Sequence, residues 1–565
     1  MRSLGETLSR EFTQNHGIDV RSYFEVLVGS IRPSLRILMG TVVLVLLIAC
    51  ANVANLLLAS GLGRQREFAI RVALGARQWD LARQLTLESV MLAVTGGLLG
   101  IGLARSVVSA FIYMAGTQLP RATSISIDGR VVAFTLGVSL LVGVFCGLWP
   151  LLRLRARELA ASVREGDTRT GSAGGRRLGN ALVVAEIALA FTLLVGAGLL
   201  VKNLVLLRQR DAGIRTDRIV SFSVTPAGPR YKEDASVTAF YRELNAQLSQ
   251  VQGVDSVGLV SHLPMLDWGW NGEFQIEGST PWAANQAPLV EYRWLHGDYL
   301  KTVGVPLLKG RLLDARDGQG TRTVLVNQAM ADKFWPNQDP IGKRFGQGTD
   351  RAQWFDVVGV VGNVRNGLTR DSLYEFYRTL DQNVFRGMAV VIRTHADDPT
   401  TVMPAARQIV ASLDPSLPLT RIQTMATVVE DSVGQPRLMS ALTGLFGALA
   451  GLLAMIGIYG VMAYNVRRQR REFGIRLALG ASHGRVRNLV VARGLALSIG
   501  GVVLGVGGAW LLTGVIQTLL NDVKPTDPTV FVGMAVAVVS VATLASYLPA
   551  RSAGKVDPMI VLRES

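Results

Sequence analysis

The residues with the most distinctive types and spacing form an eleven-residue unit that occurs twice. Arg66–Ala76 reads REFAIRVALGA and Arg471–Ala481 reads REFGIRLALGA. On a helix, the glutamate of each unit lies four residues before an arginine and can pair with it, which leaves the apolar residues to pack. We expect each helix to end at Gly75 or Gly480 in a left-handed cap. The chemistry that this unit offers is ion pairing and docking.

The sequence contains no signature of an enzyme. It has no Gly-x-x-x-x-Gly-Lys-Ser/Thr motif and no His-Glu-x-x-His motif, and its five histidines are scattered. Cys50 and Cys146 lie inside apolar segments, so no cysteine-based metal site or disulfide framework is expected. We therefore predict no catalytic residue, no metal and no cofactor in this chain.

The elements that must position the repeated unit are membrane spans. The chain is 49% hydrophobic and only 18% charged, with a mean hydropathy of +0.32. Apolar runs of about 20 residues, the length that crosses a bilayer, occur in seven places. These are Leu38–Ser60, Val90–Ala115, Val131–Leu152, Leu182–Leu206, Met439–Ala463, Leu489–Ile516 and Val530–Leu548. The predicted fold class is an α-helical membrane protein of about seven transmembrane helices with an inserted extracytoplasmic domain.

Arginine clusters orient these spans. The segments after the first, third and fifth spans are rich in arginine and are expected in the cytoplasm. The base-poor connections and the long segment at about 208–437 then face outward. The same argument accounts for the net charge of +16, which topology and anionic lipid head groups explain without nucleic acid.

The outward segment has a mixed α and β pattern. Short β-branched runs such as Ile219–Val224, Thr323–Val326, Asp356–Val361 and Met388–Ile392 predict strands. Helical patterns lie at Ala235–Val251 and Thr401–Leu413. With more than 200 residues, the segment is large enough for one or two folded units.

Five polar residues in or near the spans are candidates for function. Asn52 and Asn55 lie in the first span, where the fifth span has Gly457 and Gly460, so close helix packing accounts for both copies. Glu186 is an intramembrane acid, which is a functional candidate by default. Glu88 and Arg493 occupy equivalent places at the starts of the second and sixth spans, and we hypothesise that they pair.

The repeated unit, between an entering and a leaving span, resembles the FtsX-like permease domain of ABC transporters. The outward segment resembles the MacB-like periplasmic core domain. The order of parts most resembles the orphan permeases with two FtsX-like halves. The residues that carry the second resemblance are Gly310-Arg311, Val326–Met330, Phe334–Pro336, Asp339–Phe345 and Val358–Gly362.

This resemblance implies a division of the chain into six parts, with the first half lacking its own first span and outer domain. Residues 1–36 are then the remnant of an outer domain. The expected parts are 1–36, the first permease module 37–155, a cytoplasmic linker 156–178, a single span 179–207, the periplasmic core domain 208–437 and the second permease module 438–565.

The resemblance also implies a function: a permease subunit in the inner membrane that couples ATP hydrolysis by a separate ATP-binding subunit to motion of its periplasmic domain and drives export. It implies that ATP and Mg²⁺ are bound by that partner subunit. Further expected partners are membrane lipids and a periplasmic adaptor or a second permease copy. The coupling residues it implies are Arg66, Glu67, Ile70, Arg71, Gly75, Arg471, Glu472, Ile475, Arg476 and Gly480.

Two alternatives remain open from the sequence. One is a subunit that transmits force to regulate a cell-wall hydrolase or a sensor kinase without transport. The other is an inactive remnant of a longer permease.

Overall fold

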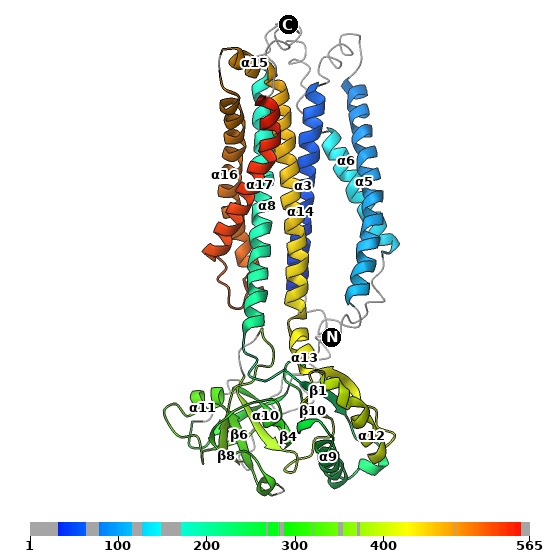
Figure 1. Ribbon diagram of the computed structural model, residues 1–565, viewed down its shortest axis with the longest axis vertical. Helices are drawn as coiled ribbons and strands as arrows, with labels where there is room; N and C mark the ends of the chain where they lie inside the picture. Colours follow the sequence, from blue (N-terminus) through cyan, green and yellow to red (C-terminus); the bar gives the residue numbers. More distant parts are fainter. Residues whose placement is uncertain are drawn as a thin grey trace, which may run out of the picture. The chain divides into compact units, whose positions relative to one another are not determined.

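The computed structural model describes residues 32–63, 78–115, 127–148 and 171–554, with short gaps at 267–268, 281, 283–287, 319, 348–353, 370–372 and 480. The chain divides into two compact units, which are described separately below. The first combines residues 1–203 with 438–565 and is helical, and the second comprises 204–437 and contains all the described strands (Figure 1).

The helical unit contains long apolar helices, and each of the seven expected spans falls on one of them. The helices are α3 (Arg32–Gly63), α5 (Gln78–Ala115), α6 (Gly129–Leu148), α8 (Gly171–Gln209), α14 (Gly434–Arg468), α15 (Arg470–Ala478), α16 (His483–Ile516) and α17 (Pro528–Gly554). Among the described residues, six of them are long and apolar enough to cross a membrane, whereas the apolar part of α6 is shorter, at 129–144.

Helix α8 is the most buried of the six spans, with 72% of its apolar segment covered by the rest of the chain. Small residues bring its neighbours close. A methyl group added at Gly505 of α16 would lie 2.8 Å from the Phe191 ring, and one added at Gly447 of α14 would touch Leu194. The hydroxyl of Ser440 in α14 also donates to the Leu200 carbonyl oxygen at 2.9 Å. In a bilayer, such close contacts and interhelical hydrogen bonds hold helices together.

The N-terminal helices pack mainly on one another. Helix α5 lies along α6, where Gly143 approaches the backbone of Val90. Helix α3 meets α8 and α14 through an apolar cluster. Its buried members are Ile48, Ala190, Leu193, Ala450 and Ala454. The two permease modules therefore share a core.

The outer unit contains eleven described strands and five described α-helices. The strands are β1 (Ile219–Val224), β2 (Val254–Val260), β3 (Trp270–Ile276), β4 (Leu289–Gly297), β5 (Leu307–Gly310), β6 (Thr323–Asn327), β7 (Arg344–Gln347), β8 (Trp354–Val361), β9 (Glu375–Thr379), β10 (Met388–Thr394) and β11 (Thr420–Thr424). The helices are α9 (Asp234–Ser249), α10 (Tyr299–Thr302), α11 (Gln328–Phe334), α12 (Met403–Leu413) and α13 (Met425–Ser432).

Strands β11, β1, β10 and β2 form an antiparallel sheet with a core on each face. Alternate residues of a strand face opposite sides. Val220 and Phe222 pack with α9 and α12, whereas Ile219 and Val391 belong to a second core that includes α13. Both faces of the sheet are therefore covered.

Six of the remaining strands close into a ring in the pairing order β3-β4-β9-β6-β8-β7 and back to β3, and β5 pairs with β8 outside this ring. Phe274, Phe345, Phe355 and Phe376 fill its interior, and α11 packs on the same core through Met330. Strand β4 belongs to both parts, because its first half pairs with β3 and its last residues pair with β2. The ring and the sheet are therefore joined through one continuous strand.

The predicted strands β1, β6, β8 and β10 and the predicted helices α9 and α12 are all present. The other seven strands were missed. Most of these have mixed polar and aromatic sequences, such as Glu375–Thr379, that show no simple alternation of polar and apolar residues.

Candidate functional site

The second copy of the repeated unit forms the short helix α15, at the end of α14 opposite its Gly434 start (Figure 1). Helix α14 ends at Arg468, and Gln469 takes the position before the first turn of α15. The Gln469 carbonyl accepts from the Phe473 amide at 2.9 Å. The side chain of Phe473 is 1% exposed, so it anchors α15 to the rest of the helical unit.

The opposite side of α15 presents charge and apolar surface. Glu472 and Arg476 form the expected i,i+4 ion pair at 2.5 Å, with each side chain 45% exposed. Ile475 and Leu479 are 50% and 82% exposed. A half-exposed ion pair stabilises a helix only slightly, and Ile475 and Leu479 add exposed apolar surface beside it.

Several candidate residues lie outside the described part of the chain. These are Arg66, Glu67, Ile70, Arg71 and Gly75 of the first unit, and Gly480 of the second. Arg471 lies in the first turn of α15. The left-handed caps expected at the two glycines therefore stay predictions.

A buried polar cluster connects α3, α8 and α14 within the helical unit. The Asn52 amide nitrogen donates to Glu186 Oε1 at 2.6 Å and to the Leu453 carbonyl oxygen at 2.9 Å. Glu186 is 0% exposed and Asn52 is 6% exposed. The structure thus brings together two of the sequence candidates, Asn52 of the first permease module and Glu186 of the single span, beside Leu453 of the second module.

A glycine makes room for this cluster. A methyl group at Gly457 would lie 2.2 Å from Glu186 Oε2 and 2.6 Å from Asn52 Oδ1. The interpretation that Asn52 and Gly457 serve close helix packing agrees with this geometry. Asn55, one turn along α3, is also buried, and its Nδ2 has no acceptor among the described residues.

Glu88 and Arg493 do not form the pair that we hypothesised from their equivalent positions. Arg493 of α16 donates to Gln469 Oε1 at 2.6 Å, and Glu88 of α5 accepts from Gln84 at 3.2 Å. Each side chain has a polar partner on its own module, within reach of its helix. The Arg493–Gln469 contact lines a cavity of 400 Å³ that Asn180 and Asn465 also line.

The outer unit contains a buried ionic cluster that sequence reasoning missed. Arg293 is 1% exposed and donates to Glu375, to Glu291 Oε2 at 3.2 Å and to Asn366 Oδ1 at 2.5 Å. Tyr377 donates to Glu375 Oε2 at 2.7 Å. The cluster lies on β4 and β9, where β4 changes its partner from β3 to β2. The sequence signal was weak, because isolated charges in short segments usually lie on the surface.

Both chain connections to the spans enter one core of the outer unit. Leu207, near the end of α8, is 0% exposed, and Val433, directly before α14, is 2% exposed. Both belong to the cluster that also contains Leu295 of β4, the strand of Arg293, and Tyr377 of β9, the strand of Glu375. A displacement of either connection would therefore act on the same packed residues.

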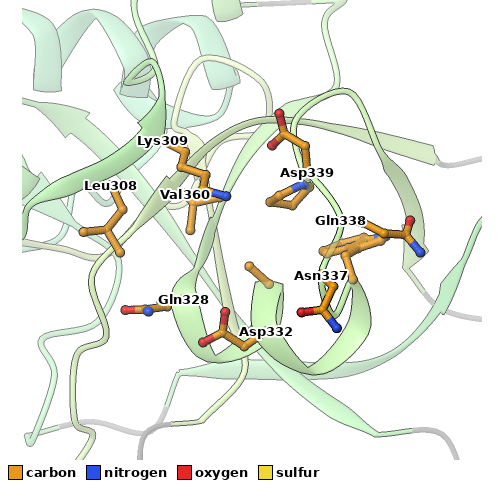
Figure 2. Close-up of a pocket in the computed structure, with 11 residues that line it drawn as sticks. Leu308, Lys309, Gln328, Asp332, Asn337, Gln338, Asp339 and Val360 are labelled. Atoms are coloured by element: carbon orange, nitrogen blue, oxygen red, sulfur yellow. The ribbon is translucent and has the colours of Figure 1, made fainter.

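An open cleft of 720 Å³ lies beside α11 on the ring. Figure 2 shows Lys309, Asp332 and Asp339 around it, with Gln328, Asn337 and Gln338. The charged side chains are all exposed, and Trp335 lies buried in its wall. The cleft offers polar surface with mixed charge and no desolvated charged group.

Two protein families match this chain. Residues 39–159 and 444–558 match the FtsX-like permease C-terminal family. Residues 181–412 match the MacB-like periplasmic core domain. The two matches to the first family correspond to the two copies of the repeated unit.

Curated relatives match about half of the chain. The uncharacterized ABC transporter permease YknZ of Bacillus subtilis is 22% identical over 280 residues, which cover 48% of this chain and 68% of that protein. The macrolide export ATP-binding/permease protein MacB of Neisseria gonorrhoeae is 23% identical over 278 residues, which cover 47% of this chain and 42% of that protein. The chain thus spans less than half the length of this MacB.

Two solved structures resemble part of the chain. The periplasmic region of MacB from Actinobacillus actinomycetemcomitans is 16% identical with a TM-score of 0.26, covering 39% of this chain and 93% of that one. The extracellular domain of the noncanonic ABC-type transporter YknZ is 15% identical with a TM-score of 0.25, covering 36% of this chain and 100% of that one.

Proposed function

Because this chain belongs to the FtsX-like permeases of ABC transporters and carries a MacB-like periplasmic core domain, we propose that it couples ATP hydrolysis by a separate subunit to motion of that domain. The chain is a multi-pass protein of the inner membrane with its large domain in the periplasm. The observation that carries the proposal is the surface of α15, with Ile475 and Leu479 exposed beside the Glu472–Arg476 pair.

The position of α15 supports docking at the cytoplasmic side. Helix α14 leaves the periplasmic domain at Gly434, so its other end, where α15 begins, faces the cytoplasm. The buried side chain of Phe473 attaches α15 to the helical unit, whereas the side chain of Leu479 is exposed and can contact a partner. An exposed apolar side chain next to an oriented ion pair gives a docking surface both contact area and register.

The two connections into one periplasmic core support transmission of the motion. Helix α8 and helix α13 both contribute to the core that contains Leu207 and Val433. A packed core is not continuously deformable, so a displacement of its edges favours movement of the core as a body. We propose that this movement acts on cargo in the periplasm and drives its export, with an adaptor or a second permease copy as a further partner.

The experiment is purification of the tagged chain from its native membranes in mild detergent, with the co-purifying ATP-hydrolysing subunit measured by ATPase activity. Leu479→Asp introduces a charge at a residue that is 82% exposed, so the variant should still fold. We expect the variant to lose the ATPase subunit. The exchange Glu472→Arg, together with Glu67→Arg in the first unit, should have the same effect.

Leu289→Asp is the matched control, because Leu289 is 59% exposed but lies in the periplasmic domain. It should retain the ATPase subunit. The proposal fails if no ATP-hydrolysing subunit accompanies the native chain, or if Leu479→Asp and Leu289→Asp behave alike. A cell-wall hydrolase or kinase that accompanies the periplasmic domain, with no transported molecule, would replace export by regulation and leave the coupling intact.

A further inference from the structure

One end of the β-ring in the periplasmic domain is occupied by an arginine among aromatic rings. Strands β4 and β9 run parallel, with Tyr292 opposite Phe376 and Trp294 opposite Arg378. Phe376 lies in the ring core. Because alternate residues of a strand share a face, Arg378 follows Phe376 as the next layer toward the end of the ring. Arg378 is 9% exposed.

The guanidinium of Arg378 has aromatic neighbours and no anion. Its central carbon lies 4.6 Å from the ring centre of Trp294, 5.7 Å from that of Tyr292 and 5.8 Å from that of Phe355. Within the described part of the domain, no hydrogen bond or ion pair joins the Arg378 guanidinium to another group, and its buried Nε has no acceptor. Arg293 differs in this respect, because two carboxylates and an amide accept hydrogen bonds from its guanidinium.

A second donor at the same place also lacks an acceptor. Trp294 is 6% exposed, and its indole Nε1 is buried without a partner. Two buried N–H donors, one on each neighbouring strand, therefore have no acceptor at one end of the ring. A buried donor without an acceptor lowers the stability of the fold, and more so when it is charged.

The aromatic faces compensate only part of this cost. The attraction between a cation and an aromatic ring is weaker than the cost of burying a charge without an ionic partner. Burial lowers the pKa of Arg378 to about 10, so the guanidinium stays charged at neutral pH. A methionine of similar length would give the domain the same packing without the penalty, so the arginine lowers stability where it stands.

Apolar surface adjoins the two donors. The Phe385 ring stacks on Trp294 with centroids 5.0 Å apart, and Trp270 meets Phe385 edge to face at 6.4 Å. Trp270 is 54% exposed. A ligand that placed an acidic group at the donors could therefore lay an aromatic or aliphatic part on these rings.

We propose that Arg378 and Trp294 form the anion end of a binding site for an amphipathic acid, a carboxylate or phosphate attached to an apolar body. The charge of the ligand supplies the acceptor that both N–H groups lack, and its apolar part packs on Phe385 and Trp270. This site does not depend on coupling to an ATPase. A ligand would bind the purified chain with or without that subunit.

The test is calorimetric titration of the full chain in nanodiscs with three probes. These are benzoate, the neutral and nearly isosteric benzamide, and inorganic phosphate. Benzoate should bind saturably and at least tenfold more tightly than benzamide. Displacement of benzoate by phosphate would place phosphate esters within the ligand class, and failure of phosphate to compete would restrict the class to carboxylates.

Three variants separate a binding role from a structural one. Arg378→Met should reduce benzoate affinity at least tenfold while the melting temperature of the domain stays equal or rises. Trp294→Phe keeps the ring but removes its N–H, and should weaken benzoate binding severalfold. Arg407→Met is the control, because Arg407 is an exposed arginine on α12, and it should change neither quantity.

The proposal is overturned if benzoate binds no better than benzamide to the native chain. It is also overturned if Arg378→Met lowers the melting temperature by several degrees with benzoate affinity unchanged, since Arg378 would then be a packing residue. Loss of the co-purified ATPase subunit would leave both results unaffected, so this proposal and the coupling proposal fail separately.

Discussion

The hydrogen bonds of Asn52 should hold α3 of the first permease module against α8 and α14. Asn52→Ala removes one hydrogen bond to Glu186 Oε1 and one to the Leu453 carbonyl oxygen. Interhelical hydrogen bonds in membranes contribute about 0.6 kcal/mol on average and up to about 1.7 kcal/mol. We therefore expect Asn52→Ala to weaken docking of α3 by about 1–3 kcal/mol, a 5- to 150-fold change in the docking equilibrium.

The pairwise part of this loss can be isolated in a double-mutant cycle with Glu186→Ala. Since one of the two bonds joins the two side chains, the coupling energy should be about 0.6–1.7 kcal/mol. The assay is energy transfer between fluorophores on Val53→Cys and Tyr459→Cys, followed as SDS is added to mixed micelles. Both positions are more than 40% exposed, and the native Cys50 and Cys146 would be replaced by serine.

Ser440→Ala supplies the control. It removes another buried interhelical bond, to the Leu200 carbonyl at 2.9 Å, but lies 13 residues before Leu453 on α14, about 20 Å at the rise of a helix. Its effect should add to that of Asn52→Ala within about 0.5 kcal/mol. A coupling energy between Asn52 and Glu186 no larger than that for this distant pair would refute this role of Asn52.

Three further predictions concern single groups. Lys202 lowers the pKa of Asp527 to about 2 through an ion pair at 2.6 Å, and the hydrogen bond from Thr529 adds to this shift. The pair stabilises the fold above the unfolded pKa of about 3.9, and this stabilisation is lost as the pH falls toward 2. In Lys202→Met the acid-induced drop in melting temperature should therefore shrink between pH 4 and 2, and an unchanged acid profile would contradict this. Arg293→Met leaves Glu291 and Glu375 without their shared cation and should lower the stability of the periplasmic domain by about 3–5 kcal/mol. The control is Arg393→Met: the ion pair of Arg393 with Asp255 is 3.5 Å long and partly exposed, so its loss should cost less than about 1 kcal/mol. Equal shifts in melting temperature for the two variants would argue against a stabilising role of the buried cluster. Burial lowers the pKa of His296, while Asp381 opposes and Arg242 assists this shift. The folded state therefore binds fewer protons than the unfolded state, and the protein loses stability as the pH falls below about 6.5. His296→Gln should flatten the profile of stability against pH below that value, and a profile identical to the native one would exclude His296 as the source of the loss.

The spans and the repeated helix could be predicted from sequence because their signals are local. A run of about 20 apolar residues crosses a bilayer whatever its neighbours are. The Glu472–Arg476 pair likewise follows from the helical repeat, and it is present at 2.5 Å. The four predicted strands carry continuous β-branched runs, which are typical of strands buried on both faces.

The missed strands depend on partners that are distant in sequence. Strand β9 is buried at all five residues, although Glu375 and Arg378 are charged. Its burial comes from β4, about 80 residues earlier, and from β6, about 50 residues earlier. The stability of a strand depends on such cross-strand contacts, so the local sequence of β9 could not predict that this segment forms a strand.

The sequence by itself therefore determined the apolar helices, the periplasmic side of the large domain and the helix of the second repeated unit, since hydropathy, charge and helical period act within a few turns. Tertiary structure alone decided which polar groups that are distant in sequence meet. Asn52 and Glu186 are 134 residues apart, and the partners of Arg293 come from three separate segments. Only the fold also shows that the Arg378 guanidinium has aromatic rings around it and no anion among the residues that the structure describes. The physical reason is that a buried charge is recognised by what surrounds it, and those surroundings come from strands and helices that the chain brings together over long separations.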